Sequence, residues 1–351
     1  LGLAERGTHY KNMPTALDHL VELGVTHVQI LPMYDFVSVD EDPKRFDDDG
    51  NYNWGYDPGH YNVPEGSYAL DARDFSSRIT ELKSMIMAFH EAGLGVIMDV
   101  VYNHTYRSED SNFHLLAPFV YHRRDGDGFS NGSGCGNEFA TETEAGRAFL
   151  LHSLKFWVEE YAVDGFRFDL MGLMDAETLI EAKEELLTDH PDLLFYGEPW
   201  AGGASVYPEE RRMLKGRQKD TGIGVFTDEF RDAVRGDNDG NVRGFIQGDF
   251  SKKYAVETGI AGSIAFDENH IGVASMADES INYINCHDNL ILRDKLEITV
   301  DDDKERIERY ELGFAILLTS FGRSFLYEGN EFYHTKKWNP NTYNAPTSLN
   351  A

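Results

Sequence analysis

The chain has little of three features that would each indicate a particular class of protein. It contains two cysteines, Cys135 and Cys286, among 351 residues, which is too few for a disulfide framework. It has 32 lysine and arginine residues against 61 aspartates and glutamates, a formal net charge of −29. A surface of that sign repels nucleic acids and anionic membranes, so we expect neither as a partner. No apolar run approaches the ~20 residues that a membrane-spanning helix needs.

The ends of the sequence also lack targeting information. The first residue is a leucine, and neither an initiating methionine nor a charged and then apolar leader precedes the first predicted helix. We therefore expect the sequence to be part of a longer chain. Its cellular location is left open between a cytoplasmic and a secreted protein.

Seven short apolar segments alternate with helical segments along the chain. Their nearly continuous apolar character indicates parallel strands that are buried on both faces. The predicted strands span residues 26–32, 94–101, 165–170, 193–198, 224–227, 281–288 and 324–327. The predicted helices span residues 14–23, 76–92, 142–161, 176–187, 229–234 and 304–319. This alternation predicts an α/β protein, and a (β/α)₈ TIM barrel fits it best.

The predicted barrel is one strand short. We expect its first strand and its last helix to be absent, so that residues 1–351 form a single barrel truncated at both ends. Two connections, at about 34–74 and 105–140, are much longer than ordinary connections, and long loops are often functional. A doubly wound open sheet is the alternative, but no glycine-rich phosphate loop follows the first predicted strand.

Polar and ionisable residues lie at the ends of four predicted strands. They are Asp99 with Asn103 and His104, Arg167 with Asp169, Glu198, and His287 with Asp288. The carboxyl ends of barrel strands converge on one face, which is where barrel enzymes have their active sites. The sequence therefore predicts an active site with three catalytic carboxylates.

Three carboxylates at one site suit the hydrolysis of a glycosidic bond. Arg167 lies two residues before Asp169, so both side chains point to one face of a strand, and the arginine keeps the nucleophile Asp169 ionised. Glu198 has aromatic neighbours, and we expect desolvation to raise its pKa and to keep a proton available for the leaving group. Asp288 would stabilise the positive charge that develops on the sugar ring. A retaining enzyme holds its two main carboxyl groups about 5–5.5 Å apart.

Five segments of the sequence resemble the signature regions of a known enzyme family. Residues 99–104, 165–169, 197–200 and 285–289 resemble, in this order, the four signature regions of the α-amylase superfamily of glycoside hydrolases. Residues 52–58, Tyr-Asn-Trp-Gly-Tyr-Asp-Pro, are similar to the segment that separates type I pullulanases from amylases and isoamylases. The resemblance covers nearly the whole chain. It implies retaining hydrolysis of α-1,6-glucosidic linkages in pullulan and in branched α-glucans such as starch, glycogen and limit dextrins.

The resemblance gives the three carboxylates the same roles as their chemistry does, and it implies further site residues. The implied substrate-binding residues are Tyr56, His104, Arg167, Trp200 and His287, and the implied structural supports are Asp99 and Asn103. Tyr56 is chosen by the resemblance alone, which places its ring under the sugar at the cleavage subsite. Trp200 is either a platform for a sugar or a wall that keeps Glu198 dry, and the sequence does not separate these two roles.

No cofactor is required for this reaction and the sequence assigns no metal ligand, but a structural calcium ion is left open. Many members of the superfamily bind a structural calcium ion near the loop that follows the strand of Asp99. No compact group of carboxylates is visible in that loop of the sequence. The expected partner is an α-glucan polysaccharide or oligosaccharide, and we expect a monomer in the full-length form.

Two other functions compete with debranching. One is an α-amylase or an oligo-1,6-glucosidase, which the segment at residues 52–58 disfavours. The other is a non-catalytic glucan-binding barrel. That hypothesis predicts the loss of at least one of the three acids, and Asp169, Glu198 and Asp288 are all present.

Overall fold

The computed structural model describes residues 2–46 and 48–350. Leu1, Asp47 and Ala351, which the predicted barrel of residues 1–351 includes, lie outside the described residues. The chain divides into two compact units, Leu1–Met213 and Leu214–Ala351, and each is described by itself. Within the described residues, no helix combines the length and the apolar character needed to cross a membrane.

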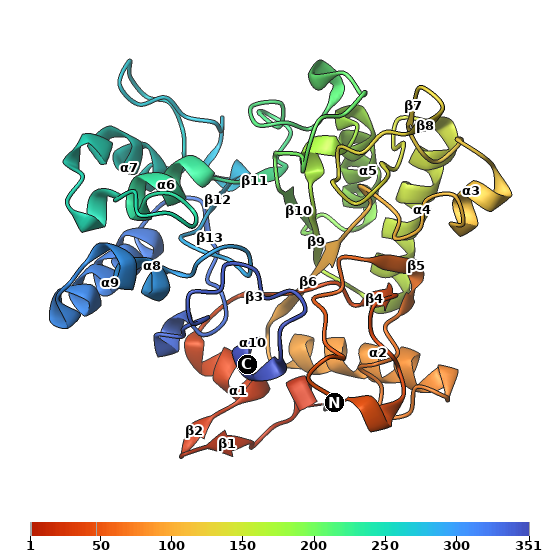
Figure 1. Ribbon diagram of the computed structural model, residues 1–351, viewed down its shortest axis with the longest axis horizontal. Helices are drawn as coiled ribbons and strands as arrows, with labels where there is room; N and C mark the ends of the chain where they lie inside the picture. Colours follow the sequence, from red (N-terminus) through yellow and green to blue (C-terminus); the bar gives the residue numbers. More distant parts are fainter. Residues whose placement is uncertain (1, 47, 351) are drawn as a thin grey trace. The chain divides into compact units, whose positions relative to one another are not determined.

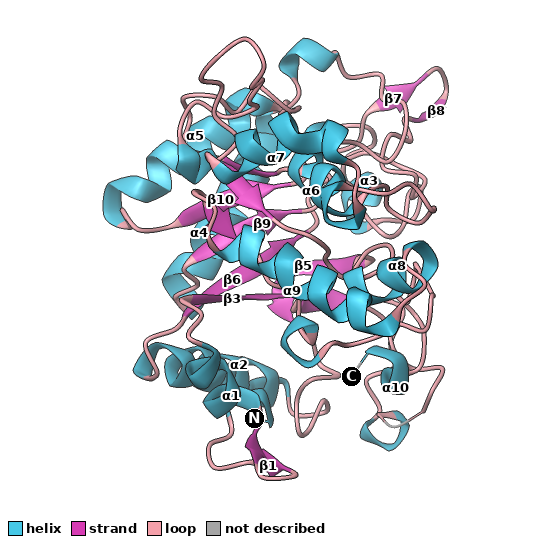
Figure 2. Ribbon diagram, turned by 90° about the vertical axis from the view of Figure 1, so that its left-hand side faces the viewer, coloured by secondary structure: helices cyan, strands magenta, loops and turns pink. Residues whose placement is uncertain are grey.

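A parallel sheet of four strands is the framework of the first unit. It consists of β3 (His27–Ile30), β6 (Gly95–Val100), β9 (Gly165–Phe168) and β10 (Leu194–Gly197), which pair in this order (Figure 2). The register sets Asp99 of β6 opposite Arg167 of β9. Every residue of β9 is buried, as are residues 96–100 of β6, which explains the continuous apolar character of these segments.

Helices alternate with these strands in the first unit. They are α1 (Ala16–Leu23), α2 (Phe75–Glu91), α3 (Asn112–Leu116), α4 (Glu144–Tyr161) and α5 (Ala176–Asp189). α2 packs against β6, and α4 packs against both α2 and α5 (Figure 1). α4 begins where the side chain of Thr143 accepts a hydrogen bond from the backbone N–H of Gly146, and its buried face carries Leu150, Leu154 and Trp157 at helical spacing.

The first unit also contains short elements outside its main sheet, several of them in the two long connections. β4 (Tyr34–Phe36) pairs with β5 (Pro58–Pro64), β7 (Arg124–Asp125) with β8 (Gly128–Phe129), and β1 (His9–Tyr10) with β2 (Met13–Pro14), all antiparallel. The 3₁₀ helices of this unit are Gly2–Ala4, Pro43–Arg45, Met171–Leu173 and Glu209–Arg211. The connection at 34–74 is therefore organised around the β4–β5 pair.

The second unit contains three parallel strands and five helices among its described residues. The strands β11 (Gly224–Phe226), β12 (Ser280–Asn282) and β13 (Arg323–Ser324) pair in this order. The helices are α6 (Asp228–Arg235), α7 (Lys253–Ile260), α8 (Leu292–Thr299), α9 (Asp303–Leu318) and α10 (Thr347–Asn350), with 3₁₀ helices at Phe245–Gln247, Phe250–Lys252, Ala277–Glu279 and Asn330–Phe332. α6 packs against α7 and α8 against α9, around buried residues that include Phe230, Ile246, Leu292 and Leu317.

The α/β class is confirmed and each of the seven predicted segments overlaps an observed strand, but several boundaries were wrong. The strand predicted for 324–327 shares only Ser324 with β13. The helix predicted from Pro14 begins at Ala16, because Pro14 belongs to β2. The strand predicted to continue to residue 170 ends at Phe168, because the backbone of Leu170 is left-handed with a φ of 41°. The strand predicted for 281–288 is β12, which ends at Asn282. Four short helices, α3, α7, α8 and α10, were not predicted from the sequence.

The first turn of α4 supplies a test of the packing, because Gly146 leaves no room for a side chain. A Cβ atom at this position would lie 2.0 Å from the carbonyl oxygen of Ala140. We predict that Gly146→Ala lowers the free energy of unfolding by about 1–3 kcal/mol, measured by urea denaturation, because the backbone must move to relieve this overlap. Gly128→Ala is the matched control, since its Cβ would have its nearest neighbour at 3.8 Å. Equal losses in the two variants would contradict the prediction.

Candidate active site

Arg167 of β9 connects three carboxylates from neighbouring strand ends. Its Nη1 donates hydrogen bonds to Oδ1 of Asp99 at 2.8 Å and to Oδ1 of Asp169 at 2.9 Å. Its Nη2 lies 2.5 Å from Oε1 of Glu198. The acids follow or end β6, β9 and β10, so the parallel register brings them to the same edge of the sheet. Arg167 is buried, with 2% of its side chain exposed.

One guanidinium faces three carboxyl groups in this cluster, and the pKa of Asp99 is raised there. Burial raises the pKa of Asp99 to about 7, against the opposing effect of Arg167 and with a further contribution from Asp169. Burial opposes the charge of Arg167, but Asp99 and Glu198 raise the pKa of this guanidinium well above its ordinary value. Arg167 therefore remains charged, whereas Asp99 takes up a proton as the pH falls below neutral.

The carboxylate of Asp169 is fixed at both oxygens and still reaches solvent. Arg167 binds Oδ1, and Nδ2 of Asn103 donates to Oδ2 at 2.8 Å and to the backbone oxygen of Asp169 at 3.0 Å. Its side chain remains 15% exposed. His104 joins the group through Asn103, whose Oδ1 lies 2.7 Å from Nδ1 of the histidine. Burial lowers the pKa of His104, with Asp169 opposing, so the imidazole is neutral at pH 7.

Glu198 lies just after β10, and its environment is more polar than the sequence led us to expect. Besides Arg167, the backbone N–H of Leu170 donates to its Oε2 at 3.0 Å. The left-handed backbone of Leu170 is a strained conformation for a leucine, at about 1–2 kcal/mol, and such strain is common at active sites. The side chain of Glu198 is 7% exposed, so burial is present as predicted, but the carboxylate lies against a cation.

Tyr56 belongs to the same cluster, although its position in a loop gave no signal beyond the family resemblance. Its hydroxyl donates to Oδ2 of Asp99 at 2.7 Å, and its ring centre lies 5.7 Å from the guanidinium of Arg167. The sequence reasoning missed Gln29 and Tyr196. Gln29 donates to Oδ2 of Asp99 at 3.3 Å and accepts from the hydroxyl of Tyr196 at 2.8 Å. The sequence did contain one signal for this site, since Gln29 is a polar residue inside an otherwise apolar strand.

Trp200 is half-buried in the segment that follows Glu198. A Cβ atom on Gly172 would lie 2.5 Å from the backbone oxygen of Trp200, so this glycine permits a close approach of the two segments. The contact involves the backbone of Trp200. It therefore leaves both predicted roles of the indole ring open.

A buried ion pair fixes the loops around these acids. Glu138 is fully buried and accepts hydrogen bonds from Nη1 of Arg123 at 2.9 Å, from the hydroxyl of Ser205 at 2.7 Å and from two groups of its own loop at 2.5 Å. Arg123 also donates to the backbone oxygen of Leu173 at 2.7 Å. Ser205 follows Glu198 and Leu173 follows Asp169 in the chain. The network thus joins the second long connection to the segments that follow Asp169 and Glu198 in the chain.

His287 and Asp288 belong to the second unit. His287 is buried, and its Nε2 lies 3.6 Å from Oδ2 of Asp288, whose side chain is 48% exposed. Lys336 donates from Nζ to the backbone oxygens of His287 at 2.5 Å and Asn289 at 3.0 Å, which holds this segment in place. The approach of Asp288 and His287 to the cluster around Arg167 stays a prediction.

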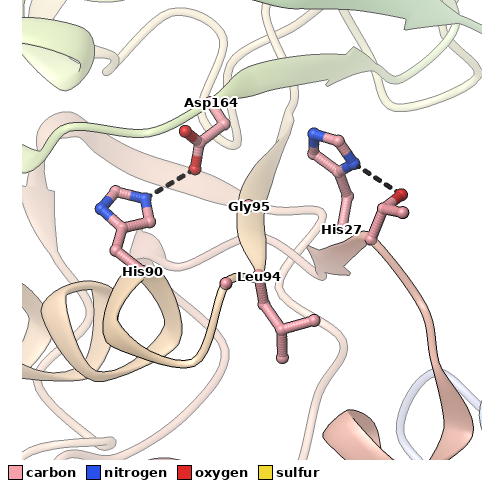
Figure 3. A pocket seen from close by; sticks show the side chains of 7 residues that line it. His27, His90, Leu94, Gly95 and Asp164 are labelled. Carbon is pink, nitrogen blue, oxygen red and sulfur yellow. Dashed lines mark hydrogen bonds and ion pairs between the residues drawn. The ribbon is translucent and has the colours of Figure 1, made fainter.

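A cavity of about 450 Å³ lies at the opposite ends of the same strands (Figure 3). His27 begins β3 and Gly95 begins β6, whereas the acids lie at the carboxyl ends. His90 pairs with Asp164 at 2.8 Å, and Asp164 also accepts the backbone N–H of Val96 at 2.6 Å. In barrels this face serves stability rather than catalysis, so the cavity is separate from the candidate active site.

Three carboxylates with the donor type that calcium prefers lie in the first long connection. Oxygen atoms of Asp35, Glu41 and Glu65 lie within 4.8 Å of one another. Each already has a partner in the chain: His60 lies 2.6 Å from Asp35, Arg78 donates to Glu41 at 2.6 Å, and two backbone N–H groups donate to Glu65 at 2.8 and 3.0 Å. This group follows β3 and not the strand of Asp99. Because the chain supplies its own cation and donors here, the residues fit a bound calcium ion poorly.

The chain is similar to known pullulanases over its whole length. No protein-family model matches it. It is 40% identical over 355 residues to the pullulanase of Bacillus subtilis (strain 168), a match that covers 100% of this chain and 49% of that protein. It is 35% identical over 350 residues to pullulanase A of Streptococcus pneumoniae serotype 4, covering 95% of this chain and 27% of that protein. The chain thus spans about half, or less, of the length of these relatives.

The structural comparison agrees with the sequence comparison. The crystal structure of the Paenibacillus barengoltzii pullulanase in complex with maltohexaose and α-cyclodextrin matches with a TM-score of 0.95 and 44% identity, over 99% of this chain and 55% of that chain. The strands and helices described above are therefore those of a partial (β/α)₈ barrel, and the chain belongs to the α-amylase superfamily of glycoside hydrolases. Within that superfamily it is a homologue of the type I pullulanases.

The raised pKa of Asp99 predicts a pH dependence of stability. Native Asp99 holds its proton up to about pH 7, whereas an aspartate in the unfolded chain loses it near pH 4. Between these values the native state binds more protons, so the stability that Asp99 contributes falls as the pH rises. We predict that Asp99→Asn costs more free energy of unfolding at pH 5 than at pH 7.5, by on the order of 2 kcal/mol.

Urea denaturation of the parent chain and the variant at both pH values measures this difference. Asp18→Asn is the control, because Arg6 lowers the pKa of the exposed Asp18 and leaves it ionised in both states above pH 5. Its effect should be the same at the two pH values. A cost of Asp99→Asn that grows between pH 5 and pH 7.5 would show that the assigned shift has the wrong sign.

Proposed function

We propose that the chain is the catalytic part of a retaining glycoside hydrolase that cleaves α-1,6-glucosidic linkages in pullulan and branched α-glucans. The observation that carries this proposal is the geometry around Arg167, which holds Asp169 at 2.9 Å and Glu198 at 2.5 Å at adjacent strand ends. The identity of 40% to the Bacillus subtilis pullulanase supports the choice of linkage.

In this mechanism Asp169 attacks the anomeric carbon while Glu198 gives a proton to the glycosidic oxygen of the leaving sugar. A covalent glycosyl ester on Asp169 results, and water activated by Glu198 then hydrolyses it with net retention. Negative charge passes from Asp169, which is consumed as a nucleophile, to Glu198, which has lost its proton. Arg167 contacts both carboxylates, so the same guanidinium stabilises the charge before and after the first step.

The remaining site residues would bind and orient the sugar. Tyr56 offers its ring as a platform, and the bond from its hydroxyl to Asp99 fixes the orientation of that ring. We propose sugar hydroxyls as the partners of His104 and His287, and a contact with the substrate for Trp200. Asp288 of the second unit would stabilise the oxocarbenium-like transition state.

The proposal treats residues 1–351 as one catalytic barrel, with the connections at about 34–74 and 105–140 around its active-site face. An α-glucan polysaccharide or oligosaccharide is the proposed partner, and a monomeric full-length protein stays a prediction. An α-amylase or an oligo-1,6-glucosidase is the competing activity. It would cleave soluble starch internally, whereas a debranching enzyme releases maltotriose from pullulan.

The nucleophile assignment supplies the test of this function. We predict that the parent chain releases maltotriose from pullulan and that Asp169→Asn lowers kcat by about 10³-fold or more, because the covalent step is lost. Binding of maltotetraose should remain measurable by calorimetry in the variant, since Asp169 contributes chemistry rather than most of the binding area.

The exposed Asp192→Asn is the control for this test, and it should keep the parent rate. Pullulan, glycogen and amylose are assayed side by side. A parent chain that binds maltotetraose but cleaves none of the three substrates would favour the non-catalytic barrel. Unchanged turnover in Asp169→Asn would refute the nucleophile.

We propose that Asp35, Glu41 and Glu65 hold no metal ion, because Arg78 donates to Glu41 at 2.6 Å and the other two carboxylates have partners in the chain. The side chain of Arg78 is 8% exposed, so this cation is part of the interior. We predict that EGTA leaves both the melting temperature and the rate on pullulan unchanged, as measured by calorimetry and by sugar release. A chelator-induced fall in melting temperature that added calcium reverses would contradict this proposal.

A further inference from the structure

A second cavity in the first unit is lined by residues of both long connections. Its volume is about 470 Å³, within the ~300–1,000 Å³ typical of small-molecule sites. Its walls come from residues 35–41 and 58–60 on one side and from residues 105–113 on the other. The described residues that line it include none of the predicted catalytic or substrate-binding residues.

The charged groups in the walls are paired within the chain. Asp35 lies 2.6 Å from Nδ1 of His60, and Arg107 donates to Asp110 at 2.7 Å. Glu41 accepts a hydrogen bond from a buried arginine at 2.6 Å. Each of the three carboxylates in the walls thus has a hydrogen-bond partner in the chain, and the cavity offers many polar atoms, which suits a ligand with many hydroxyl groups.

The walls also carry accessible groups of the types that bind sugars. Tyr106 is 46% exposed and offers a ring face, and Val37, 38% exposed, adds apolar surface. Nε2 of His60 lies 3.4 Å from Nδ2 of Asn112, and the side chains of both residues are exposed. Imidazole, amide and carboxylate groups together can donate to and accept from neighbouring hydroxyls.

Short links connect these walls to the candidate active site. Thr105 of the wall directly follows His104, whose backbone oxygen accepts from the hydroxyl of Tyr61 at 2.5 Å. The backbone N–H of Tyr106 donates to the oxygen of Pro58 at 3.3 Å, so the two walls are joined. The cavity is thus held by the same segments that position His104.

We propose that this cavity is a second α-glucan-binding site, which holds part of a long glucan away from the bond that is cleaved. The proposal rests on the proposed function for the identity of its ligand. A group bound there contributes equally to the ground state and the transition state, so it lowers KM for long substrates and leaves kcat unchanged. A substrate too short to span from the cleaved bond to the cavity gains nothing from it.

Kinetics on a long and a short substrate test this inference. Tyr106→Ala should raise KM for pullulan by roughly three- to tenfold, because one ring contact is lost. Its kcat on pullulan and its KM for a short α-1,6-branched tetrasaccharide should not change. Asn112→Ala should act in the same direction, and Tyr106→Phe, which keeps the ring, should restore the parent KM. Tyr254→Ala, an equally exposed tyrosine at 49% outside this cavity, is the matched control and should behave like the parent chain.

A direct binding measurement separates this inference from the proposed function. Calorimetric titration with maltohexaose should show weaker binding by Tyr106→Ala than by the parent chain or Tyr254→Ala, even if the chain cleaves no substrate. Unaltered pullulan KM and maltohexaose affinity in both Tyr106→Ala and Asn112→Ala, with melting temperatures like that of the parent, would overturn the proposal. An equal rise of KM for the long and the short substrate would also overturn it, because the loss would then lie at the cleavage site.

Discussion

The buried guanidinium of Arg167 is the interaction on which the first unit depends. It is the shared partner of Asp99, Asp169 and Glu198, at 2.8, 2.9 and 2.5 Å. Removing one partner of a buried ion pair typically costs about 3–5 kcal/mol, because the remaining charge is left without compensation. Here three carboxylates would lose their cation at once. Arg167 therefore links three properties of the site: the charge state of Asp99, the orientation of Asp169 and the position of Glu198.

That linkage is possible because parallel strands in register bring distant residues to one edge. Asp99 and Arg167 lie opposite each other in paired strands although 68 residues separate them. The segments behind Asp169 and Glu198 are then fixed by a second buried pair, Arg123 with Glu138, which reaches across from the long connection at 105–140. The site combines rigid strand ends with loops that are held by buried charges. Such an arrangement keeps catalytic groups in place before substrate binds.

The two long connections do more than surround the acids. One holds the paired strands β4 and β5 and Glu41, which Arg78 binds, and the other holds the buried pair of Arg123 and Glu138. Between them lies a polar cavity whose lining includes none of the predicted catalytic residues. Long connections on a barrel can thus carry binding surfaces of their own, because the strands below them already supply the reacting groups.

The sequence by itself determined the class of fold, the places of the seven strands and the polar groups at the ends of β6, β9 and β10, but not the place of Asp288, because β12 already ends at Asn282. It could do so because a strand that is buried on both faces must be apolar throughout, so a polar residue at its end stands out. It did not reveal Gln29, Tyr196 or the ion pair of Arg123 with Glu138, whose partners lie far away in the chain. Only the tertiary structure decided that Glu198 lies against a cation and that burial raises the pKa of Asp99. Burial and charge at a site depend on which segments meet, and no local pattern records that.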